Sequence, residues 1–166
     1  MICWDRCGDV VVGVFDEYEI VVLRSYAESL LRLLEHRARA YSPAGPDTAL
    51  TDPRLLAILR DRLGPGEPEW TLAWHETSCL GFVAETLRAV LETLPERGGH
   101  VRVDSRAGAE SWLRATEIYL VVLTAVADEA GRVAGRDAEP TVEWLAGIVG
   151  GLTALLATEA RPAARG

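Results

Sequence analysis

The chain has 166 residues, of which 49% are hydrophobic and 25% charged, which is typical of one globular domain and excludes disordered and disulfide-scaffold proteins. Its 25 acidic and 17 basic residues give a net charge of -8, and every basic residue is arginine. Lysine, asparagine and glutamine are absent, which indicates a GC-rich coding sequence. Because an acidic surface repels a phosphate backbone, we expect a protein partner and no direct sequence-specific nucleic-acid binding.

The first fifteen residues form the one segment whose apolar pattern is not helical. A β-branched and aromatic run covers residues 10–15, and residues 2–7 could pair with it, which predicts a small N-terminal β-hairpin or extended arm. Two strands alone are marginally stable, so the arm should pack on helices. The first twenty residues carry five acidic side chains, unlike a signal peptide, and the longest uncharged stretches, 118–127 and 144–158, are shorter than the roughly 20 residues that cross a bilayer. We therefore expect no membrane association and a cytoplasmic protein whose thiols are kept reduced.

Five helices are expected after this arm. Capping residues, prolines and glycines mark their ends: the first opens at Asp16 and stops before Ser42-Pro43, and the second starts at Thr51-Asp52-Pro53 and ends at Gly64-Pro65. The third follows Glu67-Pro68 and is closed by Pro95, the fourth is capped by Asp104 or Ser105 and ends before Gly131, and the fifth begins at Pro140. Residues 44–50, 98–103 and 131–139 are expected to be loops or short extended segments. The fold class is therefore mainly α, with one domain over 1–166: a β arm over 1–15, a compact helical bundle over 16–158 and a frayed tail over 159–166.

Three details of these helices can be tested against a structure. The arginines at the end of the first helix are expected to complement its dipole and need no other role. Small residues in the fifth helix should allow another backbone to approach closely, and these are Gly147, Gly150 and Gly151. The third helix should pack through a seam formed by Ala73, Thr77, Leu80, Ala84, Leu87, Leu91 and Leu94.

Two cysteines in the arm are the feature that a helical bundle does not require. Cys3 and Cys7 flank Trp4, Asp5 and Arg6. In an extended strand their Cα atoms would lie about 13 Å apart, whereas a disulfide needs about 4.4–6.8 Å. A bond between them would therefore require the arm to bend, and a loop this short would add only about 2 kcal/mol of stability. The pair is either a reversible redox sensor or two unpaired cysteines that pack as small hydrophobic residues.

A second constellation lies on the third helix. His75, Glu76 and Cys79 echo the HExxH spacing of zinc hydrolases, with Cys79 in place of the second histidine. A zinc site needs at least a third ligand, and the other histidines are not paired in a ligand-like way. The alternative is a half-buried histidine beside a structural cysteine. Nucleophilic triads, P-loops and dinucleotide fingerprints are absent, so we expect no catalytic residues, no metal and no cofactor.

The order of several short motifs resembles the actinomycete oxidative-stress regulator family, which is AosR-like. The resemblance covers residues 4–158, and its motifs are Phe15-Asp16-Glu17, Thr51-Asp52-Pro53-Arg54-Leu55, Leu94-Pro95 with Gly98-Gly99, Val101-Arg102-Val103-Asp104, Trp112-Leu113-Arg114-Ala115 and Glu143-Trp144-Leu145. One departure is Thr116-Glu117-Ile118, where the family is expected to have a Leu-Asn-Asp run.

This resemblance implies a specific function. Redox-regulating members of that family are described as cytosolic sensors whose N-terminal cysteine pair forms an intramolecular disulfide under oxidative stress, and Cys3 and Cys7 match the spacing of that pair. The oxidised form is understood to bind an extracytoplasmic-function sigma factor. We therefore expect a redox-sensing transcriptional regulator with Trp4, Asp5 and Arg6 as its switch region. The first alternative is a redox-silent helical protein-interaction module. The second, which has less support in the sequence, is a metal-dependent hydrolase.

Overall fold

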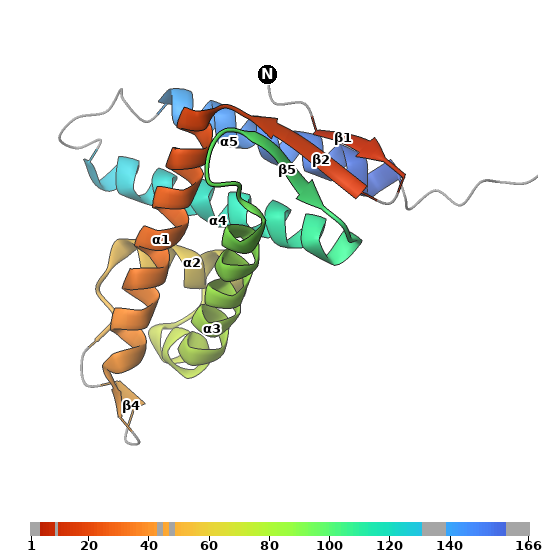
Figure 1. Ribbon diagram of the computed structural model, residues 1–166. Coiled ribbons are helices and arrows are strands. Elements are labelled where there is room, and N and C mark those ends of the chain that lie inside the picture. Colours follow the sequence, from red (N-terminus) through yellow and green to blue (C-terminus); the bar gives the residue numbers. More distant parts are fainter. Residues whose placement is uncertain (1–3, 9, 43–44, 47–48, 131–138, 159–166) are drawn as a thin grey trace, which may run out of the picture.

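The computed structural model describes residues 4–8, 10–42, 45–46, 49–130 and 139–158 (Figure 1). Its described elements are mainly helical, as predicted, and a small antiparallel β-hairpin lies at the N-terminus. The predicted tail over 159–166 and most of the predicted loop before the last helix lie outside the described residues. The helices are α1 (Glu17–Arg39), α2 (Pro53–Leu63), α3 (Glu69–Thr93), α4 (Arg106–Ala130) and α5 (Glu139–Thr158).

The hairpin is part of a three-stranded antiparallel sheet. Strand β1 (Trp4–Cys7) lies at one edge, β2 (Val10–Phe15) is central and β5 (Gly99–Val103) forms the other edge. The turn between β1 and β2 contains Gly8, whose φ of 66° favours glycine. We expected only a short extended segment near residue 100. Its pairing with β2 could not be predicted locally, because the two strands are far apart in the sequence.

A second, two-stranded pair was not predicted. Strands β3 (Tyr41–Ser42) and β4 (Gly45–Pro46) pair within and just before the segment that we expected to be an irregular loop. Each strand has only two residues, which is too short for the alternating pattern that identifies a strand in a sequence.

Local capping signals explain why the helices begin where they do. The Asp16 carboxylate accepts the backbone N–H of Glu19 at 2.7 Å, and the Glu19 carboxylate accepts the N–H of Asp16 at 2.8 Å, which confirms the predicted capping box. Asp52 caps α2 without a capping box: its carboxylate accepts the backbone N–H of Arg54 at 2.9 Å, and Pro53 is at the first helical position. At the start of α4, the Ser105 hydroxyl accepts the N–H of Gly108 at 3.0 Å, so Ser105 is the cap.

Helix α4 lies at the centre of the molecule and contacts α2, α3 and α5, while α1 packs on α3. The sheet covers one end of this assembly, and α5 runs alongside it and contacts β1 (Figure 1). One continuous core therefore joins the N-terminal arm to the last helix. Its completely buried large side chains include Leu23, Leu55, Leu87, Trp112, Tyr119, Leu145, Ile148 and Leu152.

The predicted seam of α3 is wrong in its first half. Ala73 and Thr77 are exposed, whereas Leu72 and Glu76 are buried. The physical reason is that Glu76 enters the core as half of an ion pair, a position that hydrophobic periodicity assigns to solvent. The second half of the seam agrees with the structure, since Leu80, Ala84, Leu87 and Leu94 are buried.

Helix α5 is unusually apolar for its exposure. By length and composition alone, residues Pro140–Thr158 could cross a membrane, with a mean hydropathy of 1.4, yet only 17% of that window is buried. Core helices of soluble proteins can have the same length and composition. Helix α5 packs on α4 and β1, and its buried side chains include Leu145, Ile148 and Leu152. Its outward face is formed by small residues, among them Ala146, Gly147, Gly150 and Ala154.

Candidate functional site

Trp4 is the residue of the predicted switch region that is built into the core. Its side chain is 8% exposed, although it belongs to the edge strand of the sheet. The ring lies edge-on to Phe15 and Trp112, with centroid distances of 5.6 and 5.5 Å, and those two rings stack on each other at 5.9 Å. Strand β1 is therefore attached to the bundle through one large aromatic side chain.

Two glycines make room for this ring. A Cβ atom added to Gly13, directly across the ladder from Trp4, would lie 2.7 Å from the indole, and one added to Gly151 on α5 would lie 3.0 Å from it. We name this environment the Trp4 slot; it is formed by Gly13, Phe15, Trp112 and Gly151. Close approach to the fifth helix thus occurs at Gly151, but through the Trp4 side chain and not through a backbone as predicted, whereas Gly147 and Gly150 have no atom within 4 Å of an added Cβ.

The slot holds Trp4 by packing alone. Within the described part of the chain, the buried indole Nε1 of Trp4 has no hydrogen-bond partner. An unsatisfied buried N–H group costs about 1–3 kcal/mol, which the indole would recover on reaching water. By contrast, the Nε1 atoms of Trp112 and Trp144 donate to Thr93 and Glu19, at 2.8 and 2.7 Å. Trp4 is therefore the core tryptophan whose release would be opposed least by lost polar contacts.

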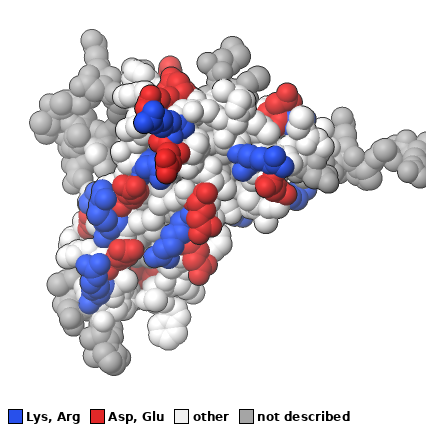
Figure 2. Space-filling view, viewed as in Figure 1, with Lys and Arg blue, Asp and Glu red and all other residues white. Residues whose placement is uncertain are grey.

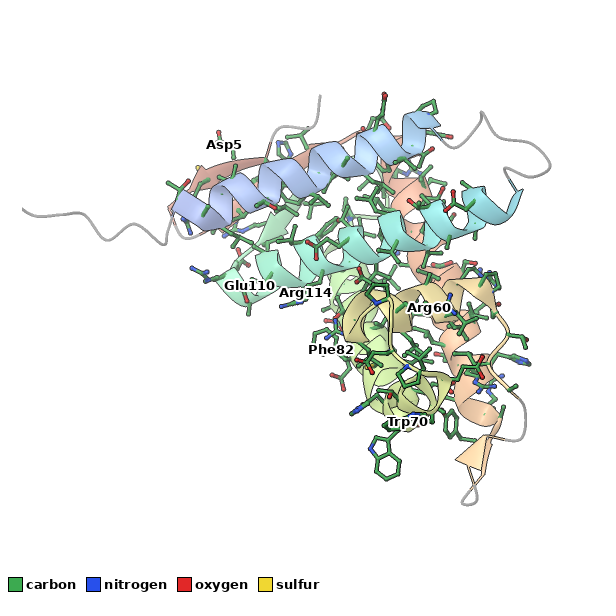
Figure 3. All side chains as sticks on the ribbon, turned by 180° about the vertical axis from the view of Figure 1, so that it is seen from behind. Asp5, Arg60, Trp70, Phe82, Glu110 and Arg114 are labelled. Atoms are coloured by element: carbon green, nitrogen blue, oxygen red, sulfur yellow. The ribbon has the colours of Figure 1, made fainter. Side chains whose placement is uncertain are left out.

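The rest of the switch region faces solvent. Asp5 and Cys7 are exposed and Arg6 is half-buried, and Asp5 points away from the bundle in Figure 3. The Arg6 guanidinium donates from Nε to the carbonyl of Gly8 at 2.9 Å, across the turn. Cys7 pairs with Val10 at the end of the ladder and is a free thiol. Cys3 lies outside the described residues. An oxidant could therefore reach the Cys7 thiol directly.

The second predicted constellation has a different role from the one that the HExxH comparison suggests. Glu76 is 1% exposed and accepts two hydrogen bonds from Arg37 of α1, at 2.5 Å from Nε and 3.1 Å from Nη2. His75 is exposed and Cys79 is half-buried. No group of three potential metal ligands occurs among the described residues. Because a general base must be available to substrate or water, this use of Glu76 argues against the hydrolase alternative.

Electrostatics in this region are dominated by the Arg37–Glu76 pair. The hydrogen bond with Glu76 raises the pKa of Arg37, and burial raises the pKa of Tyr41, whose ring lies 5.7 Å from the Arg37 guanidinium carbon. Cavities of about 340 and 310 Å³ both border Arg37, and the smaller one also borders Glu76. Sequence reasoning assigned Arg37 only to the helix dipole. The signal that could have found it is the position of Glu76 four residues from both Leu72 and Leu80, which the structure shows to be buried, because a buried glutamate needs a cationic partner.

Comparison with known proteins gives one match. The model of the family described as a domain of unknown function, DUF2017, matches residues 1–125. No curated protein and no solved structure matches the chain. The match includes β1, Trp4 and Trp112, whereas α5 lies beyond it.

Proposed function

Since the chain belongs to the DUF2017 family, for which no function is known, we propose from its own residues that it is a redox-responsive regulator. In this proposal, a disulfide between Cys3 and Cys7 bends β1 and withdraws Trp4 from its slot. The altered surface then binds a protein partner. The observation that carries the proposal is the position of Trp4: a buried aromatic anchor lies between two cysteines that can join only if the strand holding it is broken.

The geometry of β1 supports this coupling. Residues Trp4–Cys7 form an extended ladder with β2, and Cys7 is exposed at its end. A disulfide across three intervening residues needs its two Cα atoms within about 6.8 Å, roughly half the distance that an extended strand imposes. Oxidation therefore disrupts the β1–β2 hydrogen bonds. Because β1 is an edge strand, no further strand is lost with it.

The chemistry is that of a peroxide sensor. One thiolate attacks the peroxide O–O bond and becomes a sulfenic acid, releasing water or an alcohol. The second thiol attacks that sulfur, and a second oxygen leaves as water while the S–S bond forms. The two electrons come from the thiols and reduce the peroxide. A thiol reductant reverses the change by disulfide exchange. No metal or cofactor takes part.

The partner follows from the sequence resemblance. An acidic, cytoplasmic protein that acts on transcription without contacting DNA requires a protein intermediary, and we propose an extracytoplasmic-function sigma factor. A redox-silent interaction module is the competing function. It predicts partner binding that is independent of oxidant.

Proteolysis and mass measurement test the disulfide directly. After peroxide treatment, the intact chain should lose two mass units. Trypsin then cleaves after Arg6, between the two cysteines, so the peptides 1–6 and 7–24 should remain joined until a reductant is added. The Cys79→Ser variant should behave like the wild type, whereas Cys3→Ser or Cys7→Ser should abolish the linkage. Two separate peptides with free thiols after oxidation would refute the proposal.

Partner binding tests the regulatory step. Candidate sigma factors are captured with the wild type or with the Cys3→Ser, Cys7→Ser double variant, each under oxidising and reducing conditions. We expect strong retention only by the oxidised wild type. Equal retention in all four samples would favour the redox-silent module.

A further inference from the structure

The outward side of α3 carries large aromatic side chains that are exposed to solvent. Trp70 is 73% exposed, Trp74 is 82% exposed and Phe82 is 39% exposed. Twelve residues separate the first from the last, which is about 18 Å along the helix. The exposed positions between Trp74 and Phe82 are His75, Thr77, Ser78 and Gly81, none of which is acidic. We name this surface, formed by Trp70, Trp74 and Phe82, the aromatic face. Exposed apolar surface of this extent marks an interaction site.

Two arginines border the aromatic face. The guanidinium carbon of Arg62, from α2, lies 4.3 Å from the centroid of the Phe82 ring, and that of Arg114, from α4, lies 6.0 Å from it. Figure 3 shows Arg114 and Phe82 side by side, and Trp70 projecting into solvent at the other end. Cation–π contacts fix the two arginines near the ring without neutralising their charge.

These arginines differ from most others in the chain. Figure 2 shows a face on which basic and acidic side chains alternate. Among the ion pairs of the described residues, Arg32 pairs with Glu28, while Arg39 and Arg88 both pair with Glu35. Among the described residues, by contrast, neither Arg62 nor Arg114 forms an ion pair with a carboxylate. Two cations in a protein of net charge -8 are thus left for an external anionic group.

We propose that the aromatic face binds an amphipathic helix of a partner protein, with apolar side chains on Trp70 and Trp74 and carboxylates on Arg62 and Arg114. The length of the face corresponds to about 12 residues of a partner helix, or three turns. Tryptophan and arginine are the residues that contribute most to protein–protein binding energy. This proposal does not depend on the cysteine pair, and Cys7, in β1, lies far from the start of α3 in Figure 1.

The surrounding charges exclude a long polyanion and set the direction of the partner. Glu67 and Glu69 are exposed next to Trp70. At the other end both bordering arginines, Arg62 and Arg114, lie against Phe82, beside Glu85 and Glu110. A nucleic acid that followed the face would bring phosphates against these carboxylates, whereas a helix can place its acidic residues at one end only. The acidic end of the partner therefore lies over Phe82, and an uncharged or basic end lies over Trp70.

The test uses two synthetic 16-residue amphipathic helices that share one leucine stripe. In the first, Glu residues flank the stripe at one end; in the second, Lys replaces each Glu. Binding to the full chain is measured by fluorescence anisotropy of labelled peptide in 150 mM salt, a concentration at which charges more than about 8 Å apart are screened. We expect the Glu peptide to bind at least about tenfold more tightly than the Lys peptide.

Variants assign the binding to the aromatic face. All the altered side chains are at the surface, so the fold should be retained. The double variants Trp70→Ser with Trp74→Ser, and Arg62→Ser with Arg114→Ser, should each weaken the Glu peptide at least about tenfold. As the matched control, Arg97→Ser removes another exposed arginine without an ion pair among the described residues, and should leave binding unchanged.

Several outcomes would overturn the proposal. Equal binding of the two peptides would show nonspecific apolar adhesion, and binding unaffected by both double variants would place the peptide elsewhere. No binding of the Glu peptide up to 1 mM would also refute it. Sedimentation of the chain alone would reveal a second copy as the occupant if the wild type self-associates and the tryptophan double variant does not.

Discussion

Removal of one partner from the Arg37–Glu76 pair should destabilise the protein far more than removal of both. The two side chains are 8% and 1% exposed, so each charge is almost completely withdrawn from water. Deleting one member of a buried ion pair costs about 3–5 kcal/mol, because the other charge stays buried without its counter-ion. We therefore expect Arg37→Met and Glu76→Leu each to lower the free energy of unfolding by that amount.

The double variant gives the opposite expectation. Methionine and leucine approximate the volumes of the side chains that they replace, and apolar replacement of a whole buried pair is often neutral or stabilising. The double variant should therefore lie within about 1.5 kcal/mol of the wild type. Urea unfolding followed by circular dichroism measures all four proteins, and the double-mutant cycle gives the coupling energy of the pair.

An additive result would refute this reasoning. If the free energy of unfolding falls in the double variant by the sum of the two single-variant decreases, the two side chains stabilise the protein independently. The contacts between them then contribute no coupling energy. The exposed pair Arg32–Glu28 provides the matched control, since its side chains are 70% and 46% exposed. Its removal should change stability by at most about 0.5 kcal/mol.

Three further predictions concern the Trp4 slot and the cap of α2. Gly151→Val places side-chain atoms against Trp4 and should destabilise by about 1–3 kcal/mol, with increased tryptophan exposure to a fluorescence quencher. Gly147→Ala, on the same helix but with nothing within 4 Å, should instead raise the thermal midpoint, since alanine is favoured over glycine in helices by about 1 kcal/mol. Asp52→Ala removes a cap and should cost about 1 kcal/mol at pH 7. Hydrogen bonds from Arg54 lower the pKa of Asp52 below 3.8, so this contribution is complete above that pH and lost as pH falls through the lower folded pKa. A wild type and an Asp52→Ala variant that keep the same stability difference down to pH 2 would contradict the assignment.

Local sequence signals predicted the helices well because each helix end is determined by a few adjacent residues. Asp16 with Glu19, and Asp52 with Pro53, satisfy orphan N–H groups within one turn, so no tertiary information is needed to place those starts. Pairing of β5 with β2 is different in kind, since it joins residue 103 to residue 11. The sequence contains the alternating pattern of β5, but no local signal identifies β2 as the strand with which it pairs.

The same distinction separates what could be predicted of the candidate sites. The cysteine spacing indicated a possible switch, but burial of Trp4 depends on Gly13 and Gly151, which are remote from it in the sequence or on another element. The predicted seam of α3 ran through Ala73 and Thr77 and left Glu76 out, because hydrophobic periodicity considers the polarity of each residue without its partners. Burial of a charge depends on a partner, here Arg37, and only the folded chain brings the two together.

The position of the Trp4 slot determines which helices and strands a conformational change in β1 would affect. Three of its walls, Gly13, Phe15 and Trp112, lie within the part of the chain that matches the family, whereas Gly151 belongs to α5 beyond that match. Withdrawal of Trp4 therefore removes a contact that joins the sheet to α5 as well as uncovering Trp112. Because α5 also packs along α4, oxidation of the arm would act on the surface of the last helix and leave the end of α1 and the first half of α3, which hold the Arg37–Glu76 pair, unchanged. Hydrogen exchange of the oxidised and reduced protein can separate these regions: faster exchange in β1, β2 and α5 with unchanged exchange in the first half of α3 supports the coupling, and a uniform increase would show general destabilisation instead.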